Sequence, residues 1–221
     1  MKYKVIITGV TGMVGEGVLQ ECLQSPDIET VLTIGRRPSG KQHPKLKEII
    51  HTDFTDVNSI ADQLKGYDGC FCCMGVTSVG KDEATYYRMT YDMTMPLAKA
   101  FAAANPGGII TYVSGLGTDS TEKGKIMWAR VKGKTENDLM KLPVKGAYMF
   151  RPGIMTPTPG LTNTIKAYKW FGWIIPIMKL LRPNTVSTLA QVGQAMLNLL
   201  KTSPVTQVLE VKDIVKFAAK Q

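Results

Sequence analysis

Residues 5–15, V-I-I-T-G-V-T-G-M-V-G, decide the fold of this chain. A short apolar run leads directly into three glycines spaced three residues apart, and an apolar pattern with helical spacing follows through Val18, Leu19 and Leu23. This order predicts a strand, a tight turn and a helix. Glycine lets the backbone turn sharply, and the free N–H groups at a helix N-terminus attract phosphate. We therefore predict a pyrophosphate-binding loop, with an ordinary glycine-rich turn as the alternative.

The composition is that of one globular domain. The chain has 221 residues, of which 44% are hydrophobic, and this is enough to bury a core. The N-terminal apolar run is too short for a signal peptide, and no long apolar stretch predicts a membrane span. The spacing of Cys22, Cys70, Cys72 and Cys73 suits neither a disulfide framework nor a metal site. We therefore expect reduced thiols, no bound metal and a cytoplasmic protein.

The chain is basic, with 27 Lys and Arg against 18 Asp and Glu and a formal charge of +9. Such a charge suits anionic partners. The basic residues are spread along the chain, and no nucleic-acid-binding motif accompanies them. We expect a phosphorylated cofactor rather than nucleic acid.

The end of the second predicted strand, residues 30–35, bears on the choice of cofactor. In a dinucleotide fold, an acid at this point binds the adenosine ribose when the cofactor lacks a 2′-phosphate. Here Arg36 and Arg37 follow the strand, and a guanidinium can bind a phosphate through two hydrogen bonds. The pair predicts NADP(H) rather than NAD(H), and two solvated arginines are the alternative.

The remaining pattern alternates strands with helices. Apolar runs at residues 46–51, 67–74, 108–114 and 144–150 predict strands, while residues 83–104 and 125–142 have helical spacing. We predict an α/β fold, a Rossmann-type doubly wound parallel sheet with helices on both faces. Thr55 or Asp56 should cap a helix through residue 64, and Pro96 should kink the longest helix. Asp53 and Phe54 fall where an adenine would lie, or else they are a plain helix cap and a core phenylalanine.

Beyond residue 160 the alternation weakens. We assign residues 1–160 to an NADP-binding Rossmann domain and residues 161–221 to a small C-terminal helical part packed on the same domain. The apolar stretch 165–181 could cover a substrate pocket, pair with a second subunit or lie on a membrane surface, and the pocket is favoured. Ser187 or Thr188 should cap a final amphipathic helix, and residues 207–211 should add a short strand.

In order along the chain, the motifs T-G-V-T-G-M-V-G, G-R-R, D-F-T-D, C-C-M-G, V-S-G-L-G and R-P-G resemble the short-chain dehydrogenase/reductase superfamily, in its atypical, extended-like branch. The runs F-C-C-M-G-V-T, Y-Y-R-M-T-Y-D, V-K-G-K-T-E and F-R-P-G-I look like the Tat-interacting-protein oxidoreductase-like group of that branch. The likeness covers roughly residues 1–160 and implies an NADPH-binding Rossmann fold.

The resemblance also implies a catalytic tyrosine, a lysine four residues later that lowers its pKa and holds the nicotinamide ribose, and a serine on the substrate oxygen. Lys132 stands at the lysine position and Ser114 near the serine position. Trp128 stands where the tyrosine is expected, and an indole cannot exchange a proton at useful pH.

Tyrosines of the long helical stretch, Tyr86, Tyr87 and Tyr91, could replace the missing phenol, although packing roles are favoured. The candidate catalytic residues are therefore Lys132 and Ser114. The candidate cofactor-binding residues are Gly9, Thr11, Gly12, Met13, Val14, Gly15, Arg36, Arg37, Asp53, Phe54, Cys73, Met74, Gly75, Lys132, Pro152, Gly153 and Ile154.

Together these residues predict an NADP(H)-dependent oxidoreductase acting on a small carbonyl or alcohol. A catalytically silent NADPH-binding regulatory protein is the first alternative, and Trp128 favours it. A nucleotide-sugar epimerase or dehydratase is the weaker alternative, because it too would need the tyrosine.

Overall fold

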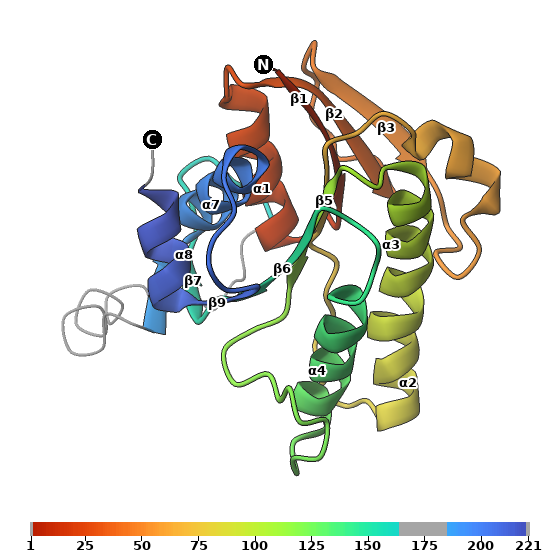
Figure 1. Cartoon of the computed structure of the whole chain (residues 1–221), viewed down its shortest axis with the longest axis vertical. Helices are drawn as coiled ribbons and strands as arrows, with labels where there is room; N and C mark the ends of the chain where they lie inside the picture. Colours follow the sequence, from red (N-terminus) through yellow and green to blue (C-terminus); the bar gives the residue numbers. More distant parts are fainter. Residues whose placement is uncertain (1, 164–184, 220–221) are drawn as a thin grey trace.

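A seven-stranded parallel sheet forms the centre of the computed structural model, which describes residues 2–163 and 185–219 (Figure 1). Its strands are β1 (Tyr3–Thr8), β2 (Ile28–Gly35), β3 (Leu46–Ile50), β4 (Gly69–Cys72), β5 (Ile109–Val113), β6 (Gly146–Arg151) and β9 (Val208–Glu210). They lie in the order β3-β2-β1-β4-β5-β6-β9, and every pairing is parallel. The order reverses between β1 and β4, which makes this edge the expected ligand-binding position and confirms the predicted Rossmann-type fold.

Helices cover both faces of the sheet (Figure 1). They are α1 (Met13–Gln24), the 3-10 helix η1 (Asn58–Leu64), α2 (Glu83–Tyr87), the π-helical turn η2 (Arg88–Asp92), α3 (Met93–Ala104), α4 (Met127–Leu139), α7 (Leu189–Lys201) and α8 (Val211–Ala218). Side chains alternate along β1, so Val5 and Ile7 join one buried cluster with α1, α7 and α8. Ile6 joins the other cluster, with α3 and α4.

One helix prediction is wrong, and the longest helical stretch contains a π-helical turn that was not predicted. The helix before residue 64 is a 3-10 helix without a side-chain cap, because Asp56 accepts the N–H of Asn58 in a local turn instead. The long helical stretch departs from α-helix at η2, one turn before Pro96. Proline has no N–H for the carbonyl four residues earlier, Asp92, and the π-helical turn ends at that residue.

The C-terminal residues extend the same sheet and core. Thr188, one of the two residues predicted to cap the final helix, caps α7 in a reciprocal capping box with Gln191. β9 lies within the predicted strand 207–211. A second, two-stranded parallel sheet was not predicted; it pairs β7 (Ile154–Thr156) with β8 (Val186–Thr188). The apolar stretch 165–181 lies outside the described residues.

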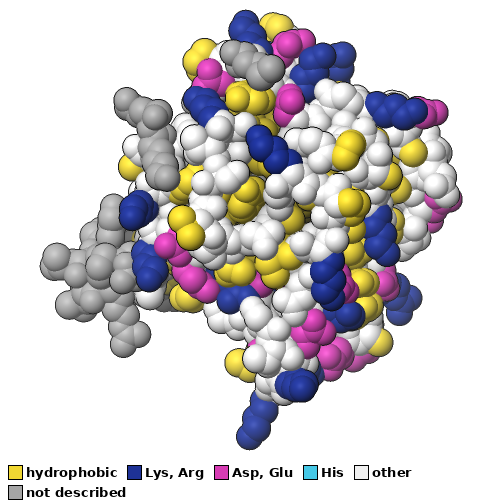
Figure 2. Space-filling model, viewed as in Figure 1, with side chains coloured by type: hydrophobic (Ala, Val, Ile, Leu, Met, Phe, Trp, Pro, Cys, Tyr) yellow, Lys and Arg dark blue, Asp and Glu magenta, His cyan; other side chains and the backbone are white. Residues whose placement is uncertain are grey.

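The surface and the cysteines agree with a globular chain. All four cysteines are free and buried. Among the helices that are described, none has the length and apolar character needed to cross a bilayer. On the face seen in Figure 2, Lys and Arg side chains are scattered among acidic ones rather than gathered in one patch.

Candidate functional site

Two cavities meet at the switch point of the sheet. The larger has a volume of about 770 Å³ and the smaller about 230 Å³. Both are lined by Gly12 from the glycine loop and by residues 73–76, which follow β4. The two cavities therefore form one cleft that runs across the ends of the strands on either side of the glycine loop.

Two glycines of the loop, Gly9 and Gly15, leave no room for a side chain. Gly9 has φ of 75°, and a Cβ there would lie 2.6 Å from backbone atoms of Cys73. A Cβ on Gly15 would lie 2.2 Å from the carbonyl oxygen of Gly9. Gly12 stands at the N-cap of α1 without a side-chain cap, and Met13 and Val14 of the first turn line the larger cavity. The first N–H groups of α1 therefore have no side-chain cap, and the glycines allow a ligand to come close to the backbone. Such a helix N-terminus suits an anion.

The smaller cavity gathers the residues predicted for the adenosine end. Thr11, Arg36, Arg37 and Phe54 all line it. Both arginines are exposed, and neither forms an ion pair within the described residues, so two cations face this cavity uncompensated.

Asp53 is not among the lining residues. Its carboxylate accepts the backbone N–H of Thr55 at 2.9 Å and the Thr55 hydroxyl at 2.5 Å, and these bonds lower its pKa. Met89 and Met93 line the same cavity although sequence reasoning missed them, because methionines on a helical pattern give no signal beyond packing.

The larger cavity brings both candidate catalytic residues together with several candidate cofactor-binding residues and Trp128. Its lining includes Cys73, Met74, Gly75, Ser114, Trp128, Lys132, Pro152, Gly153 and Ile154. The Nζ of Lys132 donates to the backbone oxygen of Ser114. Burial lowers the pKa of Lys132 to about 8, against the opposing effect of the Glu136 charge.

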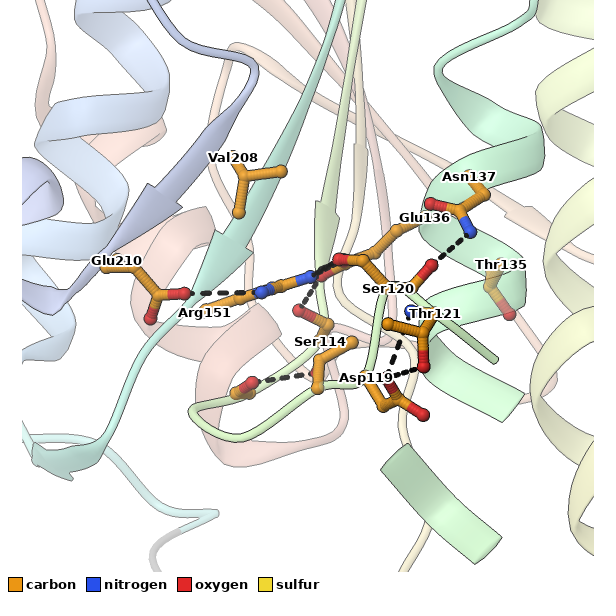
Figure 3. Close-up of polar contacts among 12 residues, drawn as sticks. Ser114, Asp119, Ser120, Thr121, Thr135, Glu136, Asn137, Arg151, Val208 and Glu210 are labelled. Atoms are coloured by element: carbon orange, nitrogen blue, oxygen red, sulfur yellow. Dashed lines mark hydrogen bonds and ion pairs between the residues drawn. The ribbon is translucent and has the colours of Figure 1, made fainter. Parts of the chain in front are cut away.

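The hydroxyl of Ser114 is committed to a buried polar cluster (Figure 3). It donates to Glu136 Oε1 at 2.5 Å and lies 3.0 Å from the carbonyl oxygen of Phe150. Glu136 is fully buried and pairs with Arg151, which also contacts Glu210 at 3.3 Å. Glu136 was missed from the sequence, where nothing distinguishes it from a surface glutamate of an amphipathic helix. In this geometry the Ser114 hydroxyl donates its hydrogen bond to Glu136 and is part of the buried polar cluster.

The three tyrosines of the long helical stretch have packing roles, as favoured. Tyr86 is buried, and Tyr91 donates to Asp138 at 2.8 Å while stacking on Tyr87 with ring centroids 4.8 Å apart. None of the three lines either cavity. The phenol that the resemblance implies is therefore not supplied by these residues.

Sequence reasoning also missed Glu16, which lies in the first turn of α1 and is only 1% exposed. Its carboxylate accepts the backbone N–H groups of Thr162 and Asn163, at 3.0 and 2.7 Å, and pairs with Lys41 at 3.0 Å. Burial raises its pKa, but these bonds outweigh burial and bring the pKa down to about 2. Because Asn163 lines the larger cavity, Glu16 fixes one wall of the cleft to the helix behind the glycine loop.

Comparisons with known proteins agree with this architecture. The protein named FMP52, mitochondrial, of Debaryomyces hansenii is 29% identical over 170 residues, which cover 74% of this chain and 73% of the relative. FMP52-2, mitochondrial, of Scheffersomyces stipitis is 26% identical over 230 residues, and 97% of each chain is covered. The crystal structure of uronate dehydrogenase from Agrobacterium tumefaciens has a TM-score of 0.67 at 17% identity, over 94% of this chain and 76% of that one. At that identity the structural likeness shows the fold alone.

The names of these relatives overturn the predicted cytoplasmic location. Seven of the curated relatives, all named FMP52 proteins, carry the word mitochondrial in their names. The prediction rested on reduced cysteines, which indicate a reducing environment but do not distinguish the cytosol from other reducing compartments.

The family is shown by the N-terminal part of the chain. The model of the NAD dependent epimerase/dehydratase family matches residues 5–121, more than half of the 221 residues. The matched region contains the glycine loop, both arginines and Ser114. The chain belongs to the NAD dependent epimerase/dehydratase family.

Proposed function

We propose that this protein binds NADP(H) and acts as an oxidoreductase on a small carbonyl compound or alcohol. Membership of an NAD dependent family supports a nicotinamide dinucleotide. One observation carries the choice of NADP(H): the glycine loop contributes to both cavities, and the smaller one is lined by Arg36 and Arg37, which have no ion-pair partner in the part of the chain that the structure describes. The resemblance of the runs F-C-C-M-G-V-T and V-K-G-K-T-E to the Tat-interacting-protein oxidoreductase-like group supports this proposal.

Different lining residues would bind different parts of the cofactor. The backbone of residues 9–15 would hold the pyrophosphate, Arg36 and Arg37 would hold the 2′-phosphate, and Phe54 would contact the adenine. Lys132 would hold the nicotinamide ribose. When bound, NADPH supplies a hydride.

Lys132 is also the group that gives the proton in this proposal. Among the described residues that line the larger cavity, only Lys132 and Cys73 carry ionisable side chains. Burial raises the pKa of Cys73 well above its ordinary value, so its thiol is a poor acid near neutrality. The ammonium of Lys132 has three N–H donors, of which one goes to Ser114, and its lowered pKa makes it a usable acid.

Titration with NADPH and NADH tests the cofactor proposal. Wild-type protein should bind NADPH at least about tenfold more tightly, because the extra phosphate meets two guanidinium groups. The double variant Arg36→Ala/Arg37→Ala should lose that preference while keeping its affinity for NADH within about threefold. Lys47→Ala, which removes an exposed cation of β3 that lines neither cavity, is the matched control. Equal affinities of the wild type for the two nucleotides would refute NADP(H) specificity.

A catalytically silent NADPH-binding regulatory protein is the second candidate, and Trp128 at the tyrosine position favours it. A panel of aldehydes and quinones followed by NADPH absorbance separates the two. Turnover that disappears in Lys132→Met supports the oxidoreductase. Tight NADPH binding without turnover of any compound, in the wild type and in Trp128→Tyr alike, supports the regulatory protein.

A further inference from the structure

The larger cavity has an apolar wall built from four separate elements. Val113 ends β5, Leu116 lies in the loop after it, Trp128 lies on α4, and Ile154 and Met155 lie on β7; all five line the cavity. Ligand pockets typically have volumes of roughly 300 to 1,000 Å³ and mostly apolar walls. A cavity of about 770 Å³ therefore has room for the nicotinamide end of a cofactor and for a small second molecule.

Leu116 is the most informative of these residues. Its side chain is 46% exposed although it is large and apolar. Its backbone is fixed, because its N–H donates to the carbonyl oxygen of Pro152 at 3.0 Å. A leucine held at the cavity wall and left open to water offers apolar surface for a ligand to bury.

The polar groups of this cavity are few, and several are already paired. Ser114 donates its hydroxyl to Glu136, and the N–H of Asn163 donates to Glu16. Among the described lining residues there is no Asp, Glu or Arg, and Lys132 is the only cation. A nucleotide sugar would bring two phosphates and several hydroxyls into this cavity, and each polar group buried there without a partner weakens binding.

From this arrangement we propose that the larger cavity binds a neutral carbonyl compound, or its alcohol, with an apolar aromatic or alkyl body. The apolar body lies against Leu116, Trp128 and Met155, and the oxygen accepts a hydrogen bond from Lys132. This inference rests on the proposed function, since it names the substrate class of the same site.

Calorimetric titration of the NADPH-loaded full chain tests the inference through binding rather than turnover, because NADPH cannot transfer a hydride to an alcohol. The probe is 2-naphthalenemethanol, a neutral aromatic alcohol, and the comparator is UDP-glucose. We expect the naphthalene alcohol to bind at least about tenfold more tightly than UDP-glucose. Leu116→Asn should weaken its binding at least about fivefold, because an amide replaces part of the apolar wall. Val205→Asn is the matched control, since Val205 is exposed and lines neither cavity, and it should change binding less than twofold.

A second variant, Met155→Gln, changes the β7 wall and keeps the test valid if Leu116→Asn does not fold. Tighter binding of UDP-glucose, or unchanged binding of the naphthalene alcohol to both cavity variants, would overturn the inference. A parallel NADPH titration separates the two proposals. Wild-type protein that binds NADPH but not the naphthalene alcohol refutes this inference alone, whereas failure to bind NADPH refutes the proposed function and this inference with it.

Discussion

Glu16 shows how one buried carboxylate can connect distant parts of the chain. It accepts hydrogen bonds from residues 146 and 147 positions away, beside the pairing with Lys41. A carboxylate is well placed here for two reasons: it satisfies several donors at once, and it lies in the first turn of a helix, where negative charge is favoured. Because the same helix begins at the glycine loop, Glu16 also holds the cleft wall in register with that loop.

Glu16→Gln should destabilise the protein by about 1–3 kcal/mol at pH 7, because the amide cannot accept all of these bonds and leaves buried donors poorly paired. The folded pKa of Glu16, about 2, lies below its ordinary value of 4.5. Its stabilising effect is therefore complete above about pH 4.5 and is lost as the pH falls through about 2. Urea unfolding of both proteins should show the difference shrinking over that range.

Glu29→Gln is the control for this measurement, since Glu29 is exposed and its pairing with Lys4, at 3.6 Å, is a surface ion pair. Glu29→Gln should lower the free energy of unfolding by less than about 0.5 kcal/mol. A loss from Glu16→Gln as small as that of the control would show that the buried bonds to residues 162 and 163 contribute little.

Lys132 gives the proposed reaction a pH dependence. Its pKa is lowered to about 8, so the ammonium form that gives the proton is depleted as the pH rises through that value. In the reductive direction kcat should be constant below about pH 7 and fall about tenfold for each unit well above pH 8. Rates measured from pH 6 to 10, with NADPH affinity followed in parallel, test this. A flat profile up to pH 10 would exclude Lys132 as the acid.

At the scale of elements, the turn between β1 and α1 depends on space as well as on backbone conformation. Gly9 and Gly40 have nearly the same φ, 75° and 73°, but a Cβ on Gly40 meets nothing within 4 Å. Gly40→Ala should lower the free energy of unfolding by about 1–2 kcal/mol, because alanine is strained in the left-handed conformation. Gly9→Ala should cost at least about 2 kcal/mol more, because its Cβ overlaps the backbone of Cys73.

Urea unfolding and NADPH titration of the two glycine variants measure this difference. NADPH affinity should fall sharply in Gly9→Ala and stay near that of the wild type in Gly40→Ala. Similar effects of both substitutions on stability and on NADPH would show that conformation, and not the approach to β4, explains the glycine at position 9.

The elements that could be predicted from the sequence are those whose signals are local. The glycine turn, the alternating strands and the cap at Thr188 each depend on a few adjacent residues. The sheet of β7 and β8 could not be predicted, because it pairs two three-residue segments that lie 32 positions apart in the sequence, and no local pattern indicates such a pairing. The bond between Ser114 and Glu136 joins residues 22 positions apart, one directly after β5 and the other on α4, and only the tertiary fold brings them together.

At the scale of the whole molecule, the described C-terminal residues pack on the same sheet and core as the N-terminal ones, although the regular alternation of the sequence stops near residue 160. β9 pairs with β6 at the edge of the main sheet. Val192, Met196, Ile214 and Phe217, from α7 and α8, lie in the same buried cluster as residues of β1 and α1. The C-terminal residues therefore cover one face of the Rossmann sheet, and we propose that residues 1–160 and 161–221 fold together.

A fragment of residues 1–160 tests this proposal. Without β9, α7 and α8, apolar side chains of β1 and α1 would be exposed to water, and each buried side chain of that size contributes about 1.5–3 kcal/mol. Since the total stability of a domain is only about 5–15 kcal/mol, the fragment should not unfold cooperatively in urea and should not bind NADPH. Co-expression with residues 161–221 should restore both properties to the level of the full chain. A sigmoidal urea transition of the fragment alone, shifted upward by NADPH, would instead show that residues 1–160 form an independent domain.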